Sequence, residues 1–437
     1  VAPVQNLPPN MRIYALERSL SREEKAQEQS SAQNDLIGRD AEKAELHAAF
    51  HTAINGTPNA PPSNVNLSST GNNPIAVLTQ GIVTTRAVVG ELGIGKTALT
   101  ATFISELPPN TRVIRTECTP VRIEVPYSAL ADLVRDAIGA SGDESFDDMA
   151  LLIARAGAGA SASNIDASNP MVQRLSEIAA NQQREGQGGE DEDAHYRKKL
   201  LVSGLRHLIA AIAVEQPVVF LIEGLQWADK PTLDIIAELL KQQDPLPVLA
   251  VLVTRPDDRV AHLLEGKVRI ELHGLSSEEQ IRLVEARLNV RDGVRQVCAE
   301  LMPRVGGNPF YLLEMIDALL ERGVLEIRED ALVREGGGEL DAMGLPSTLE
   351  QLLADRIHEL PGSERVIVDW LAIAGGPLGL ADLAKLNTRS SLRASEDAIT
   401  RLCARGLCDR KGDVLDFRHP LTRDVAYASL DSTTRSR

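Results

Sequence analysis

The chain has 437 residues, of which 43% are hydrophobic and 25% are charged, and its formal net charge is −16. This length favours two to four domains, each large enough to bury its own core. The acidic balance argues against nonspecific binding to nucleic acid or to anionic membranes, because both require clustered Lys and Arg.

The cysteines and the hydropathy pattern indicate a cytoplasmic location. The four cysteines are spaced in a way that fits neither a zinc site nor a disulfide framework, as expected in a reducing compartment. They are Cys118, Cys298, Cys403 and Cys408. No apolar run reaches the roughly eighteen residues that a membrane span requires, so no membrane contact is expected. Because the chain begins at Val1 and not at Met, we expect a fragment of a longer protein.

The first 34 residues predict a short strand followed by a polar linker. The strand is expected in MRIYAL, at 11–16, and charged and polar residues follow it. The stretch VQNLPPNMRIYALERS also resembles the last strand and exit linker of a class III nucleotide cyclase domain. The alternative is a plain linker.

Residues 35–258 have the pattern of an α/β domain. Apolar segments predict strands at 86–90, 111–118, 217–224 and 246–255. Helical patterns lie between them, and two further helices are expected at 40–50 and 96–107. Near-continuous apolar strands that alternate with helices are typical of a parallel sheet with helices on both faces.

Helical patterns dominate from residue 259 onwards. Ser276 and Glu279 have the spacing of a capping box and predict the start of a helix. We expect a helical unit over 259–334. A last compact unit over 335–437 begins with a glycine-rich loop and contains helices, with short strands near its end.

The octapeptide GELGIGKT fits the phosphate-loop pattern G-x-x-x-x-G-K-[ST] and lies between an apolar strand and a helix, as that pattern requires. Its glycines allow a tight turn in which backbone N–H groups face phosphate oxygens. Lys96 can reach the β- and γ-phosphates, and Thr97 can ligate Mg²⁺. The expected nucleotide-binding residues of this loop are Gly90, Gly93, Ile94, Gly95, Lys96, Thr97 and Ala98.

Six motifs occur in the order found in one family. They are LIGRD, GELGIGKT, LIEGLQWADKPTLDII, LVTRPDD, GGNPFYLLEMIDALL and FRHPLTRDVAYASL. Together they resemble the signal-transduction ATPases with numerous domains (STAND), a branch of the AAA-related P-loop ATPases that includes the NB-ARC switches. The resemblance covers about residues 35–435. It implies a P-loop domain, a helical lid over 259–334 and a winged-helix domain over 335–437.

The resemblance also implies roles for residues outside the phosphate loop. Arg39 would lie beside the base, Pro309 would contact the adenine, and Arg255 would detect the γ-phosphate. His419 would bind the β-phosphate of ADP from the winged-helix domain. Two plainer interpretations remain open: Arg255 in an ordinary ion pair at a strand end, and Pro309 as the first residue of a helix.

The acidic motif departs from the family pattern. Relatives carry two adjacent acids where this chain has Glu223 and Gly224. Glu223 can support Mg²⁺ together with Thr97, but glycine offers no general base, and such a base contributes roughly 10²- to 10⁴-fold to a rate. Asp229 is the nearest substitute carboxylate, although capping of the following helix is its other expected role.

We therefore expect a switch module of a larger regulator that binds ATP or ADP with Mg²⁺ and hydrolyses slowly or not at all. Protein partners or self-assembly would act through flanking domains, and nucleic acid is not an expected partner. Two alternatives remain. One is an active AAA-type remodeller. The other is a transcription regulator that binds DNA through Arg401, Arg405, Arg410, Lys411 and Arg418.

Overall fold

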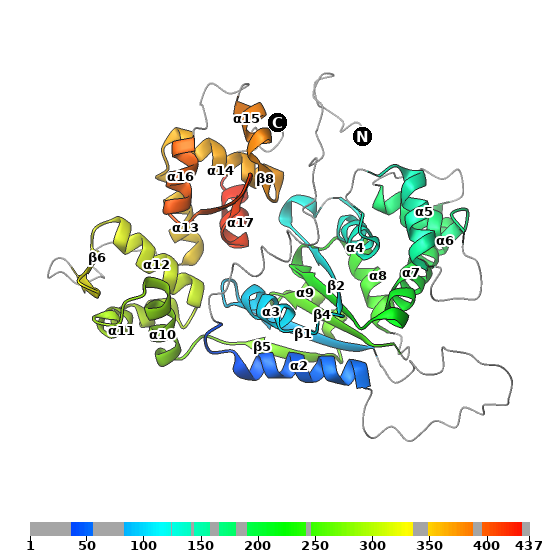
Figure 1. Cartoon of the computed structure of the whole chain (residues 1–437), viewed down its shortest axis with the longest axis horizontal. Coiled ribbons are helices and arrows are strands. Elements are labelled where there is room, and N and C mark those ends of the chain that lie inside the picture. The colour runs from blue at the N-terminus through cyan, green and yellow to red at the C-terminus, as the bar shows by residue number, and fades with distance from the viewer. Residues whose placement is uncertain are drawn as a thin grey trace.

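The computed structural model describes residues 36–55, 83–123, 125–140, 144–157, 166–180, 190–241, 246–334, 348–387 and 396–430. The strand and linker expected over 1–34, with the cyclase-like stretch, lie outside these residues. Within them three parts follow one another along the chain: a sheet domain, a helical lid and a C-terminal domain of helices and a small sheet (Figure 1).

The first part is built on a five-stranded parallel sheet of order β2-β3-β4-β1-β5. Its strands are β1 (Thr84–Gly90), β2 (Arg112–Glu117), β3 (Val218–Glu223), β4 (Val248–Thr254) and β5 (Val268–Leu272). The first four agree with the strands expected from sequence. The fifth extends the sheet past residue 258, where we expected the domain to end, because β5 pairs with β1.

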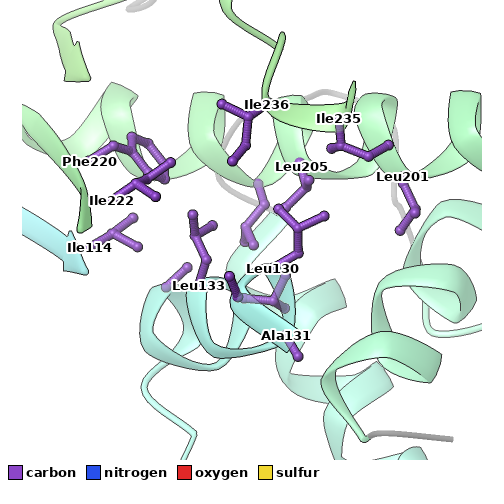
Figure 2. Close-up of a cluster of buried hydrophobic side chains, with 14 of the residues drawn as sticks. Ile114, Leu130, Ala131, Leu133, Leu201, Leu205, Phe220, Ile222, Ile235 and Ile236 are labelled. Carbon is purple, nitrogen blue, oxygen red and sulfur yellow. The ribbon is translucent and has the colours of Figure 1, made fainter. Parts of the chain in front are cut away.

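Helices cover both faces of this sheet. On one face α2 (Asp40–Asn55) and α3 (Lys96–Ser105) pack on alternate strand residues such as Val219 and Leu221. On the other face the intervening residues, such as Phe220 and Ile222, face a second core. Figure 2 shows part of that core, where side chains of β2, β3, α4 (Ser128–Ile138), α7 (Glu190–Glu215) and α8 (Lys230–Leu240) gather. The alternation follows from the two-residue period of a strand.

Several short elements complete the sheet domain. The helices α5 (Phe146–Gly157) and α6 (Pro170–Ala179) pack on α7 and α4 at one side of the sheet (Figure 1). The helix α9 (Asp258–Leu264) connects β4 to β5, and two 3₁₀ turns, η2 (Pro120–Arg122) and η4 (Leu225–Trp227), follow the ends of β2 and β3. Both turns therefore lie at the carboxyl end of the sheet, where parallel-sheet proteins bind ligands.

The lid contains α10 (Ser277–Leu288), α11 (Val294–Val305) and α12 (Pro309–Glu321), followed by a hairpin of β6 (Leu325–Arg328) and β7 (Ala331–Arg334). The expected capping box is present, since Ser276 and Glu279 satisfy each other's backbone N–H groups at the start of α10. Leu275 N–H donates to Gly307 O at 2.8 Å, which joins the end of the sheet domain to the lid.

The last part has the element order of a winged helix. It consists of α13 (Leu349–His358), α14 (Gly362–Ala374), β8 (Leu378–Gly379), α15 (Leu380–Asn387), α16 (Glu396–Ala404), β9 (Cys408–Lys411), β10 (Val414–Phe417) and α17 (Pro420–Ala428). The strands β8, β10 and β9 form an antiparallel sheet beside α14 to α17. The expected fold class, a P-loop-type parallel sheet followed by a helical lid and a winged-helix domain, is confirmed.

Candidate functional site

The glycine-rich stretch lies where the sequence predicts it, between the end of β1 and the first turn of α3. Gly93 (φ 72°) and Gly95 (φ 104°) adopt left-handed conformations that other residues rarely tolerate. Lys96 Nζ donates to the carbonyl oxygens of Gly90 and Glu91, both at 2.8 Å, so its ammonium group lies against the loop. A cation beside exposed N–H groups at a helix N-terminus suits an anionic phosphate.

The remaining loop residues divide between the core and the surface. Ile94 is buried against α2, α3 and the sheet, whereas Thr97 and Ala98 are exposed. Arg39 is buried and donates from Nη2 to Ile94 O at 3.1 Å and to His273 O at 2.5 Å. Arg39 therefore holds the phosphate loop against the end of β5. Its guanidinium is bound to protein carbonyls, and contact with a base stays a prediction.

Glu223 ends β3 and is almost fully buried behind α3. Its Oε1 accepts a hydrogen bond from Thr100 Oγ1 at 3.2 Å, and its Oε2 forms an ion pair with Arg115 of the neighbouring strand. Thr97 lies one helical turn before Thr100 on α3. Mg²⁺ takes a few oxygen ligands from protein, such as hydroxyl and carboxylate oxygens, and keeps several waters. Because Glu223 already pairs with Arg115, the metal role of Thr97 and Glu223 stays a prediction.

Gly224 cannot be replaced by a second acid without disturbing the backbone. Its φ is +66°, and a Cβ built on it would lie 2.4 Å from the carbonyl oxygen of Cys118. Asp229 is the N-cap of α8, where its two oxygens accept from Thr232 N at 2.9 Å and from Thr232 Oγ1 at 2.6 Å. Asp229 thus has the capping role, and its catalytic role stays a prediction.

The lid contacts the phosphate loop through the start of α12. Asn308 caps this helix by accepting from Tyr311 N at 3.0 Å, and its Nδ2 donates to Leu92 O at 2.6 Å. Phe310 N–H donates to Gly93 O at 3.3 Å. Pro309 is at the first position of the helix, which agrees with its plainer interpretation. The two hydrogen bonds bring Pro309 close to the phosphate loop, as an adenine contact also requires.

The C-terminal domain reaches the same region through the start of α17. His419 stacks on Phe310, with ring centroids 3.9 Å apart and an interplanar angle of 16°. Its Nδ1 accepts from Leu421 N at 3.1 Å, which caps α17. An accepting Nδ1 leaves Nε2 to carry the proton of the neutral ring. His419 can therefore cap α17 and also donate a hydrogen bond from Nε2.

Two ion pairs join α17 to the carboxyl end of the sheet. Arg255 Nη2 lies 3.4 Å from Asp424 Oδ2, and Arg423 Nη2 lies 3.0 Å from Glu117 Oε1. Arg423 and Asp424 are neighbours on α17, whereas Glu117 ends β2 and Arg255 follows β4. The Arg255 guanidinium also lies 5.9 Å from the ring centroid of Trp227. The expected ion-pair role of Arg255 is therefore present in this structure.

The cationic groups at this junction influence one another. Burial, followed by the charge of Arg255, lowers the pKa of Lys96 to about 8. Burial, followed by the charges of Lys96, Arg255 and Arg423, lowers the pKa of His419 to about 3. An anion bound between these groups would stabilise the charged form of each of them. The site therefore favours a negatively charged ligand.

The structure brings together most of the residues predicted from sequence and adds others. Gly93, Lys96, Arg255, Pro309 and His419 meet at one junction of three parts. The additional residues are Thr100, Arg115, Glu117, Asn308, Phe310, Arg423 and Asp424. Two of them had a signal in the sequence. Asn308 directly precedes a proline at a helix start, which is a typical N-cap position, and Glu117 ends a predicted strand at the carboxyl edge of the sheet.

The basic residues of the C-terminal domain are largely paired. Arg401 and Arg405 both lie beside the buried Glu364, Arg410 pairs with Glu396, and Arg418 pairs with Asp409. Ion pairs of this kind partly cancel the positive potential that a DNA backbone requires. Among the described helices, none is long and apolar enough to cross a bilayer.

Part of the chain matches a known protein family. Residues 83–252 match a family model described as AAA ATPase domain. The matched segment runs from the start of the sheet domain through the phosphate loop and Glu223 into β4. The expected resemblance to AAA-related P-loop ATPases is confirmed for this segment. No curated protein matches the chain.

Solved structures resemble the chain only remotely. One is the STAND protein with a tetratricopeptide repeat sensor from Pyrococcus horikoshii, with 14% identity, a TM-score of 0.41, and coverage of 86% of this chain and 45% of that one. The Walker-type ATPase of Pyrococcus abyssi shows 12% identity, a TM-score of 0.40, and 90% and 97% coverage. Drosophila ORC bound to DNA shows 13% identity, a TM-score of 0.39, and 98% and 96% coverage. This chain thus spans less than half the length of the first of these proteins, and likenesses this remote assign no activity or partner.

Proposed function

Because residues 83–252 form an AAA-related P-loop ATPase domain, we propose that the chain is a nucleotide-dependent switch in which bound ADP or ATP controls the docking of the lid and winged-helix domain on the sheet domain. Hydrolysis in this switch is weak or absent. Its protein partners, or its own self-assembly, act through flanking domains of a larger regulator.

The observation that carries this proposal is the convergence of three parts of the chain on the phosphate loop. The lid contributes the hydrogen bonds of Asn308 and Phe310 to loop carbonyls. The winged-helix domain contributes His419 and the Arg423–Asp424 pair. A phosphate placed beside Lys96 would interact with all three parts at once. A ligand that binds one arrangement of domains more tightly than another shifts the population towards it.

Weak hydrolysis is supported by the surroundings of the acidic motif. The Oε1 and Oε2 of Glu223 have Thr100 and Arg115 as partners, Gly224 has no side chain, and Asp229 caps α8. Position 224 therefore offers no base, and the two carboxylates nearby are already engaged by protein groups, which disfavours them as bases. The loss of such a base typically lowers a hydrolysis rate by about 10²- to 10⁴-fold.

A Mg²⁺ ion bound with the nucleotide would lie near Thr97 and Glu223. When bound with a nucleotide, the ion neutralises phosphate charge. The protein's own contribution is to orient the phosphates with loop N–H groups and Lys96, and to sense them with Arg255 and His419. Arg255 reaches α17 in this structure by way of Asp424, so a γ-phosphate beside Arg255 would compete with Asp424 for the same guanidinium.

The proposal is tested by two measurements on the purified chain. Protein is first denatured and the released nucleotide is quantified by chromatography; phosphate release with added ATP and Mg²⁺ is then followed. We expect near-stoichiometric nucleotide and negligible turnover. Lys96→Ala should remove the nucleotide, since a charge-assisted hydrogen bond contributes about 1.5–3 kcal/mol.

Small-angle scattering with and without nucleotide then tests the switch itself. ADP is expected to keep the chain compact, and ATP to expand it. Rapid steady-state hydrolysis would reject the weak-hydrolysis part of the proposal. Equal dimensions in apo, ADP and ATP states would reject the coupling of nucleotide to domain docking.

A further inference from the structure

The contact between Arg115 and Glu223 also bears on the metal ion at the nucleotide site. Arg115 lies on β2 and Glu223 ends β3, two adjacent parallel strands in which Glu117 is the register partner of Glu223. Arg115 precedes Glu117 by two residues, so its side chain lies on the same face of the sheet as Glu223. That face carries α3 and the phosphate loop.

Both oxygens of the Glu223 carboxylate have a partner. Arg115 Nη2 bonds Oε2, and Thr100 Oγ1 donates to Oε1 at 3.2 Å. The carboxylate side chain is only 6% exposed, whereas that of Arg115 is 37% exposed. Burial lowers the pKa of Arg115, but the charges of Glu223, Glu117 and Asp136 together raise it above its usual value. The guanidinium therefore stays charged next to Glu223.

This charge changes what Glu223 can offer to a metal ion. An acid at the end of this strand supports Mg²⁺ by supplying negative charge to the ion and its bound waters. An arginine in direct contact cancels that charge and repels a cation at the same place. We propose that Arg115 neutralises the Glu223 carboxylate at the nucleotide site, so that this chain binds ADP or ATP with little dependence on Mg²⁺. The proposal rests on the nucleotide binding proposed above.

The test is the affinity of the chain for ADP, measured by isothermal titration calorimetry on nucleotide-stripped protein in Mg²⁺ and in EDTA. We expect the dissociation constants of the unaltered chain in Mg²⁺ and in EDTA to differ by no more than about threefold. In Arg115→Met, which removes the charge but keeps much of the side-chain length, Mg²⁺ should tighten ADP binding by about tenfold or more.

A matched control separates this effect from the general loss of an arginine. Arg86 on β1 also pairs with a glutamate, since its Nε lies 3.7 Å from Glu45 Oε1, away from the phosphate loop. Arg86→Met should keep the small Mg²⁺ effect of the unaltered chain. Arg115→Lys keeps the positive charge and should therefore also keep the small Mg²⁺ effect.

The outcomes distinguish this proposal from the proposed function. Tightening of ADP binding by Mg²⁺ of tenfold or more in the unaltered chain would overturn it, and this result needs no variant to fold. Equal Mg²⁺ effects in Arg115→Met and Arg86→Met would also overturn it. Failure of the unaltered chain to bind ADP in either buffer would instead reject the proposed nucleotide binding.

Discussion

Restoring the second acid of the motif should damage this protein instead of activating it. Gly224 has a φ of +66°, and a Cβ there would approach the Cys118 carbonyl oxygen to 2.4 Å. The left-handed conformation costs a residue with a side chain about 1–2 kcal/mol. Crowding in a packed region adds about 1–3 kcal/mol. Gly224→Ala should therefore destabilise the sheet domain by roughly 2–5 kcal/mol, a large share of the 5–15 kcal/mol typical of a domain.

Gly266 provides the matched control. Its φ is +69°, but a Cβ there would have nothing within 4 Å. Gly266→Ala should cost only the conformational part, about 1–2 kcal/mol. The difference between the two variants isolates the contact with Cys118.

Denaturant unfolding followed by tryptophan fluorescence measures both costs. The chain has two tryptophans. In a Trp370→Phe background the remaining Trp227 reports on the acidic motif, because its Cδ1 lies 3.7 Å from the Cβ position of Gly224. Equal unfolding free energies for Gly224→Ala and Gly266→Ala would refute the reasoning. So would a stable Gly224→Asp variant with fast ATP turnover.

Two further predictions concern the lid and the winged-helix domain. Asn308→Ala should lower the free energy of unfolding by about 1 kcal/mol through the lost helix cap. It should also weaken ADP binding in calorimetry, because Asn308 Nδ2 donates to Leu92 O. The control Asn169→Ala, which removes the cap of α6 before another proline, should leave the ADP affinity unchanged; an equal loss of ADP affinity in both variants would contradict the role of Asn308. The lowered pKa of His419 predicts that domain docking is fully stable above pH 6.5 and weakens as pH falls towards 3, by about 1 kcal/mol at pH 5.5. Small-angle scattering should show that the chain expands across this pH range. His419→Asn, which keeps a cap acceptor, should not show this expansion.

The sequence predicted the sheet domain well because its signals are local. The strands at 86–90 and 217–224 are continuous apolar runs, and the phosphate loop has a fixed spacing between glycines and lysine. The last strand escaped prediction because VRIEL is short and only two of its residues are buried. An edge strand with exposed residues has a weak apolar pattern, so the domain boundary was placed too early.

The site was predictable in its parts and not in its contacts. Lys96, Arg255 and His419 could be named from their motifs, but their shared junction depends on how the lid and winged-helix domain dock. The Arg115–Glu223 pair depends on the register of β2 against β3, which the sequence does not encode locally. Similarly, the glycine at 224 was recognised as a missing base, whereas its left-handed backbone became visible only with Cys118 in place.

The opposite charges of Arg423 and Asp424 give the docking of α17 a defined alignment. Arg423 faces the negative Glu117 and Asp424 faces the positive Arg255. A slip of α17 by one residue in one direction would bring Arg423 towards Arg255, and a slip in the other direction would bring Asp424 towards Glu117. Either slip breaks both ion pairs and places one pair of like charges together, which disfavours the wrong arrangement. The two ion pairs therefore favour a single docked position of α17 on the sheet domain.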